Sequence, residues 1–120
     1  MGTDLFISER TDYRTDDNCR TQYTVTLLYN FERNAYKIME YTENLTGMAN
    51  CTTITVGAEQ FISALKRMKD DMLFIEHDGE HYANEERDLK NAIEDLEYFI
   101  EEFNLKEDED ERIFEVHLWF

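Results

Sequence analysis

Between Glu85 and Glu111 the chain has a long run of apolar residues at helical spacing, followed by a cluster of acids. Apolar residues that recur every three or four positions line one face of a helix. Asn84 is expected to cap the start of this helix, and Asn104 to mark its end. An apolar face must be covered, so the rest of the chain is expected to form a folded domain against it. The predicted buried positions are Leu89, Ala92, Ile93, Leu96, Phe99, Ile100 and Phe103.

Five other segments have the composition and alternation that are typical of strands. They are Asp4–Glu9, Tyr23–Tyr29, Ala35–Thr42, Thr52–Val56 and Ile113–Phe120. The asparagines in residues 30–34 favour a turn, so the second and third segments are predicted to pair as a hairpin. Residues 10–22 contain few apolar side chains and are interpreted as a loop or an irregular extension of the first strand.

A further helix is predicted to begin near Gly57 or Ala58 and to bury an apolar stripe that ends at Met72. Residues 73–82 fit a small ribbon around Asp78-Gly79, an extension of this helix, or a loop equally well. The predicted element order is β-β-β-β-α-α-β over one domain, residues 1–120. This order predicts the α+β class, with a largely antiparallel sheet and two helices packed on one face.

The net charge of −16 is concentrated in the C-terminal part of the chain. Residues 1–75 hold 11 acidic and 8 basic residues, a net charge of −3, whereas residues 76–120 hold 17 acidic and 4 basic residues, a net charge of −13. Free nucleic acids and anionic membranes repel such a surface. The expected partners are therefore basic proteins rather than nucleic acid or membrane.

No apolar run approaches the length of a membrane span, and residues 1–10 do not resemble a secretion signal. The protein is therefore expected in the cytoplasm, with Cys19 and Cys51 as reduced thiols. Its oligomeric state cannot be inferred from the sequence.

Two rows of carboxylates follow the outer side of the C-terminal helix. Asp88, Asp95 and Glu102 recur every seven residues, and a second row consists of Glu94, Glu97 and Glu101. Neighbours in such rows lie about 5–10 Å apart along a helix, a spacing similar to that of phosphates along a nucleic-acid strand. A nucleic-acid mimic is one interpretation, and an ordinary solvated face is the other.

The acidic run Glu107–Glu111 lacks the glycine and the alternating ligands of a calcium loop. It is interpreted as the end of the same acidic surface, not as a metal site. The complete set of predicted partner-binding residues is Asp88, Glu94, Asp95, Glu97, Glu101, Glu102, Asp108, Glu109, Asp110 and Glu111.

Few signs of enzymatic chemistry are present. His77-Asp-Gly-Glu-His81 combines imidazoles with carboxylates, but it has neither the spacing of a zinc helix nor a third ligand beside it. No motif flanks either cysteine, and the four glycines form no phosphate loop. No catalytic residue, metal or cofactor is predicted. The aromatic residues expected at the surface, where they would suit an arginine-rich partner, are Tyr13, Phe31, Tyr41, Tyr82, Tyr98 and Trp119.

Three runs resemble the small acidic anti-CRISPR proteins of phages, above all those that inhibit Cas9. They are Tyr23-Thr-Val-Thr, Tyr36-Lys-Ile-Met-Glu and Glu59-Gln-Phe-Ile-Ser-Ala-Leu-Lys66, within a match to about residues 23–70. The N-terminal segment and the C-terminal strand have no counterpart in the resemblance. It implies a small antiparallel sheet packed on helices, and carboxylates presented to the cleft that would otherwise hold DNA.

The leading hypothesis is a phage-encoded acidic inhibitor that blocks the nucleic-acid-binding surface of a host defence protein, with a CRISPR effector such as Cas9 as the first candidate. The alternatives are an immunity or antitoxin protein that neutralises a basic toxin nuclease, and a structural protein whose acidity serves only solubility. On the first hypothesis the site of action is the cytoplasm of the host cell.

Overall fold

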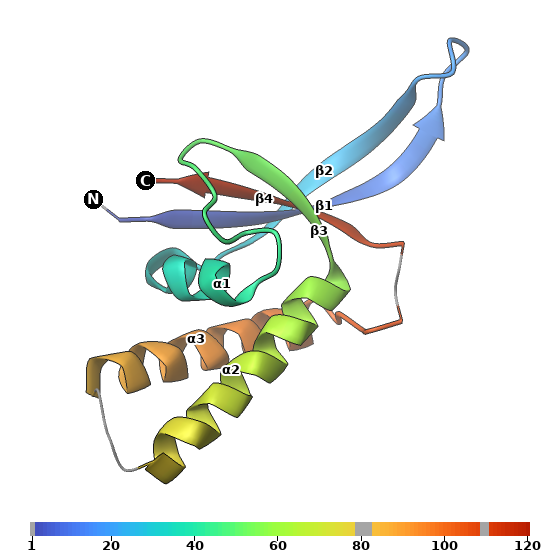
Figure 1. Ribbon diagram of the computed structural model, residues 1–120. Coiled ribbons are helices and arrows are strands. Elements are labelled where there is room, and N and C mark those ends of the chain that lie inside the picture. Colours follow the sequence, from blue (N-terminus) through green and yellow to red (C-terminus); the bar gives the residue numbers. More distant parts are fainter. Residues whose placement is uncertain (1, 79–82, 109–110) are drawn as a thin grey trace.

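The computed structural model describes residues 2–78, 83–108 and 111–120 (Figure 1). These residues form an antiparallel four-stranded sheet in the order β2-β1-β4-β3, with three α-helices on one of its faces. The predicted α+β class and antiparallel sheet are therefore confirmed. The elements are β1 (Asp4–Thr15), β2 (Thr21–Asn30), the short 3-10 helix η1 (Glu32–Asn34), α1 (Ala35–Tyr41), β3 (Thr53–Gly57), α2 (Ala58–Asp78), α3 (Ala83–Glu102) and β4 (Ile113–Trp119).

The two central strands supply the sheet side of the core. Leu5 and Ile7 of β1 lie opposite Leu118 and Val116 of β4, and all four side chains are fully buried. Burying each such side chain stabilises the fold by about 1.5–3 kcal/mol. The alternation predicted for the final strand is confirmed from Phe114 to Leu118. Phe114, Val116 and Leu118 are buried beneath the helices, and the residues between them are only partly buried. Strand β4 thus lies at the centre of the sheet, although it is the last strand in the sequence.

Helix α3 is held on the sheet by a cluster of aromatic rings. The ring centre of Phe99 lies 5.3 Å from that of Phe31, 5.2 Å from that of Phe61 and 6.2 Å from that of Phe114. These rings come from α3, the segment after β2, α2 and β4, so one cluster joins both layers. The stripe predicted from Leu89 to Phe99 is buried, and Ile100 and Phe103 pack against the core.

The prediction of a strand at Ala35–Thr42 was wrong, because residues 35–41 form helix α1. Ala35, Ile38 and Met39 are buried at helical spacing, whereas the exposed Tyr36 is one of the residues on which the strand pattern depended. A seven-residue apolar pattern fits either periodicity, so this segment alone does not distinguish a strand from a helix. The observed order is β-β-α-β-α-α-β.

The hairpin therefore joins different segments from those predicted. Strand β1 runs on to Thr15 and pairs with β2, so most of residues 10–22 are strand rather than loop. The turn is built on Asp16, whose carboxylate accepts hydrogen bonds from the backbone amides of Asn18 and Arg20 at 2.9 Å each. This is an Asx-type turn, in which a side chain replaces the backbone carbonyl of an ordinary turn.

The observed ends of α2 and α3 can be compared with the helix boundaries predicted from the sequence. Helix α2 extends to Asp78, and the predicted turn at Gly79 lies outside the described residues, as does Tyr82. Helix α3 begins at Ala83, so Asn84 lies inside its first turn rather than before it. At the other end Asn104 has a φ of 55° and its amide bonds the carbonyl of Glu101, while the amide of Leu105 bonds that of Ile100. These two hydrogen bonds are a Schellman motif, so Asn104 ends the helix as predicted.

The hairpin of β1 and β2 extends well beyond the helix layer (Figure 1). The first seven residues of β2 are exposed, and the molecule measures 62 Å along its longest axis and 22 Å along its shortest. Its radius of gyration is 16.0 Å. About 14 Å is expected for a compact domain of this length. The domain therefore consists of a packed body and a projecting two-stranded arm.

Candidate protein-binding face on helix α3

Arg112 fixes the C-terminal end of α3 to the sheet. Its guanidinium donates to both carboxylate oxygens of Glu9 on β1, at 2.7 and 2.9 Å, and to the backbone oxygens of Phe103 and Asn104 at 2.8 and 3.1 Å. Bidentate pairs of this kind restrict orientation as well as adding energy. Arg112 therefore binds the carbonyls of the two residues that follow α3 and anchors the end of the helix. No pattern in the sequence marks Arg112 or Glu9.

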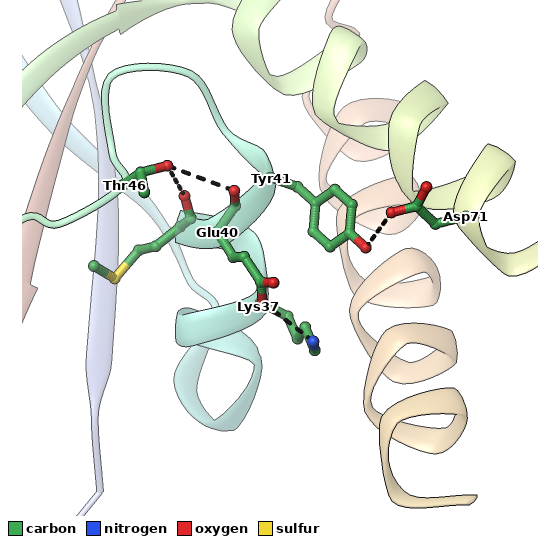
Figure 2. Close-up of polar contacts among 6 residues, drawn as sticks. Lys37, Glu40, Tyr41, Thr46 and Asp71 are labelled. Atoms are coloured by element: carbon green, nitrogen blue, oxygen red, sulfur yellow. Dashed lines mark hydrogen bonds and ion pairs between the residues drawn. The ribbon is translucent and has the colours of Figure 1, made fainter. Parts of the chain in front are cut away.

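Helix α1 is tied to α2 by one polar contact and carries an ion pair of its own (Figure 2). The hydroxyl of Tyr41 donates to a carboxylate oxygen of Asp71 at 2.6 Å, and Lys37 forms an ion pair with Glu40 at 3.1 Å. Burial raises the pKa of Tyr41 above its usual range, and the hydrogen bond to Asp71 raises it further. These contacts stiffen the support of α3 without contributing to its outer face.

Asp95 differs from the other predicted contact residues because its carboxylate is used inside the fold. The hydroxyl of Tyr29 donates to one oxygen of Asp95, and the side-chain amide of Asn34 donates to the other at 2.8 Å. Burial raises the pKa of Tyr29 above its usual range, and the adjacent Asp95 raises it further. Asp95 therefore ties α3 to the end of β2 and to η1. The sequence placed Asp95 in an outer row because it contains no sign of this partnership.

Three other acids near or on the predicted face have cationic neighbours. Glu97 forms an ion pair with Lys69 of α2 at 3.1 Å, and Asp88 lies 3.4 Å from Arg87. Glu107 pairs with Lys66 of α2. All three pairs are substantially exposed, so each is expected to contribute only about 0–1 kcal/mol. Glu97 and Glu107 are thus partly neutralised by lysines of α2, and Asp88 by the adjacent Arg87.

A smaller set of carboxylates is directed at solvent. Glu94, Glu101 and Glu102 are exposed, and none of the ion pairs among the described residues involves them. Asp108 and Glu111 are also exposed beyond the helix, while Glu109 and Asp110 lie outside the described residues. Between Glu94 and Glu101 lies Tyr98, whose side chain is 52% exposed and whose ring centre is 5.7 Å from that of Tyr29. We call Glu94, Tyr98, Glu101 and Glu102 the outer face of α3.

A shallow groove runs beside this outer face. It is lined by the ring of Tyr98, by Glu94 and by residues 29–34, which include Glu32 and Arg33. An exposed aromatic ring among carboxylates can receive a guanidinium group through both cation–π and ion-pair contacts. Tyr98, Tyr13 and Trp119, which were predicted at the surface, are all exposed. Phe31 was wrongly expected there, since it is 1% exposed in the aromatic cluster, and Tyr41 is half-buried.

The remaining sequence hypotheses concern metals, thiols and membranes. Among the described residues no group of three or more His, Cys, Asp or Glu side chains could hold a metal ion. The side chain of His77 and the whole of His81 lie outside the described residues. Cys19 and Cys51 are both free and exposed. The described helices are too short or too polar to cross a bilayer.

The chain was also compared with known proteins. Models of known protein families, curated protein sequences and solved structures all give no match to it.

Proposed function

We propose that the protein is an acidic inhibitor whose outer face on α3 occupies a basic, nucleic-acid-binding surface of another protein. The first candidate is a host CRISPR effector such as Cas9, blocked by a phage-encoded protein that mimics DNA. The observation that carries the proposal is the placement of Glu101 and Glu102. Both are exposed in the last turn of α3, which contains no basic residue.

Carboxylates in the last turn of a helix oppose its dipole. The C-terminal end of a helix carries a partial negative charge, so each acid there costs about 0.3–1 kcal/mol at low salt. Like charges four residues apart, such as Glu97 and Glu101, cost about 0.2–0.5 kcal/mol more. A helix selected only for stability would carry lysine or arginine at these positions. The unfavourable placement is therefore explained if Glu101 and Glu102 serve a partner.

The outer face suits arginine-rich surfaces that bind nucleic acid. Such proteins hold nucleic acid in positively charged channels, and Cas9-type proteins read a short DNA motif through arginines. Glu94, Glu101 and Glu102 would accept charge-assisted hydrogen bonds from these groups, and Tyr98 would stack on one of them. Because α3 is fixed by its aromatic core and by Arg112, its backbone should lose little conformational entropy when it binds a partner. Association should be fast and should weaken as salt increases.

A competition experiment tests the proposal. A purified Cas9–guide complex binds fluorescently labelled target DNA, and displacement of the DNA by the protein is followed by fluorescence anisotropy. The wild type is expected to displace DNA, and a triple variant Glu94→Gln, Glu101→Gln, Glu102→Gln is expected to lose at least about tenfold in potency, since charge-assisted bonds are worth about 1.5–3 kcal/mol each.

The matched control removes three exposed carboxylates elsewhere: Asp17→Asn, Glu43→Gln and Glu59→Gln. It changes the net charge equally and should retain potency. If the two triple variants compete equally well, the effect is due to total charge and the assignment of the outer face fails. If the wild type displaces nucleic acid only from a basic nuclease, the protein is an immunity protein and the CRISPR target is wrong.

A further inference from the structure

Strand β2 is an edge strand that lacks two of the usual protections against pairing, charged residues and proline. It lies at one end of the sheet, and its sequence, Thr21-Gln-Tyr-Thr-Val-Thr-Leu-Leu-Tyr-Asn30, contains no charged residue and no proline. Charged residues make up 33% of the whole chain. Proteins normally protect exposed edges with lysine, proline, short strands or bulges, because unpaired amides and carbonyls there can bind another strand. An edge of ten residues without charge or proline is therefore a candidate interface.

The exposed part of this edge has no inserted residue of its own, although β1 carries a bulge opposite it. The pairing with β1 shifts at Leu28, where β2 has one extra residue, and again between Thr11 and Arg14, where the extra residue lies on β1. Residues 21–27 of β2 therefore run without an inserted residue, and all seven are exposed. They lie on the arm beyond the helix layer, so no helix blocks the approach of another strand (Figure 1).

Apolar side chains follow one face of the same segment. Tyr23, Val25 and Leu27 are 39%, 47% and 61% exposed, and the guanidinium of Arg10 lies 4.4 Å from the ring centre of Tyr23. The opposite face carries Thr24 and Thr26. In an antiparallel pair, side chains directly opposite one another share a face, and Thr–Thr and aromatic–aliphatic pairs are favourable there.

We propose that β2 pairs antiparallel with β2 of a second copy of this chain, about a two-fold axis at Val25. A second copy is the expected partner because the sequence of the segment is nearly symmetric about Val25: Tyr23-Thr-Val-Thr-Leu27. Around this axis Val25 lies opposite Val25, Thr24 opposite Thr26, and Tyr23 opposite Leu27. Such a contact is self-complementary, as a two-fold interface requires, and joins the two sheets into one.

The distribution of charge permits self-association through this edge. Two chains with a net charge of −16 repel each other, so copies can meet only where the contact itself adds no like-charge pairs. The segment 21–27 satisfies this condition, because it contains no charged residue.

Sedimentation equilibrium of the full chain tests the proposal. The wild type is expected to reach twice the monomer mass, with a dissociation constant that falls as sodium chloride is raised from about 0.1 to about 0.5 M, because salt screens the repulsion between copies. Val25→Lys and Val25→Glu each place like charges directly opposite one another and are expected to weaken dimerisation at least about tenfold. An equimolar mixture of the two variants should restore the dimer. Thr55→Lys, on the other edge strand β3, is the matched control and should dimerise as the wild type does.

A cysteine variant tests the register independently. In a background of Cys19→Ser and Cys51→Ser, Val25→Cys places two thiols opposite each other at a separation that permits a disulfide, and oxidation should yield a covalent dimer. Thr53→Cys on β3 should not yield one. A wild type that stays monomeric at high salt, or a mixture of charged variants that does not dimerise, would overturn the proposal. The result is separate from the proposed inhibition, whose affinity should change with salt in the opposite direction.

Discussion

Helix α3 and strand β2 belong to one small domain, yet their surfaces have opposite character. Helix α3 carries eight acidic and two basic residues, whereas β2 carries no charged residue. The helix is fixed from Leu89 to Phe99 by buried side chains, while most of β2 projects beyond the core. The difference matches the two proposed uses, a charged face on α3 and an uncharged edge on β2. The negative charge is therefore unevenly distributed over the molecule.

The largest expected effect comes from removing the support that α3 depends on. Phe99→Ala is expected to destabilise the fold by about 3–5 kcal/mol, because it leaves a cavity among the aromatic rings that join helix and sheet. Urea unfolding followed by circular dichroism measures the change. Tyr98→Ala, one residue along and exposed, should change the free energy of unfolding by less than about 0.5 kcal/mol. Equal effects would show that the aromatic cluster does not anchor the helix.

An intermediate effect should separate the structural carboxylate on α3 from the exposed ones. Asp95→Ala is expected to cost about 1–3 kcal/mol, because it removes the acceptor for both Tyr29 and Asn34. Glu94→Ala, at the adjacent exposed position, should have almost no effect on the free energy of unfolding. If the two variants are equally stable, Asp95 belongs with the binding residues after all.

The pH dependence of stability gives a second measure of Asp95. The pKa of Tyr29 is raised in the folded state, so folding favours its neutral form. Its contribution is fully present below the unfolded value near 10 and is lost as pH rises above it. Stability of the wild type should therefore fall above about pH 10. The fall should be smaller in Asp95→Ala, since the hydrogen bond and charge of Asp95 contribute to the shift in the pKa of Tyr29.

The smallest expected effect is a gain in stability rather than a loss. Glu101→Gln and Glu102→Gln are each expected to stabilise the fold by about 0.3–1 kcal/mol at low salt, because they remove charges that oppose the helix dipole. The same changes are expected to weaken displacement of DNA from the target. Thermal unfolding at two salt concentrations measures the first effect. If a variant is no more stable than the wild type and inhibits equally well, these acids are only solvated.

Periodicity predicted the long helices better than it predicted the short elements. The stripes of α2 and α3 extend over several turns, so a helix is the only structure that places all of those side chains on one side. Residues 35–41 offered a short pattern compatible with both strand and helix. The choice depended on how the segment packs in the assembled core, where Ala35, Ile38 and Met39 are buried. The role of Asp95 escaped prediction for the same reason, because its partners Tyr29 and Asn34 lie more than 60 residues away.

The sequence by itself determined the α+β class, the buried stripe of α3 and the concentration of acids in residues 76–120. These follow from composition and from spacing within single segments, which act over a few residues. Only the tertiary structure decided that β4 lies at the centre of the sheet and β2 at its edge, and that Glu94, Glu101 and Glu102 remain exposed while Asp95 is bonded within the fold. Strand order and side-chain pairing depend on contacts between distant segments, and the packing of the whole core decides which of those contacts form.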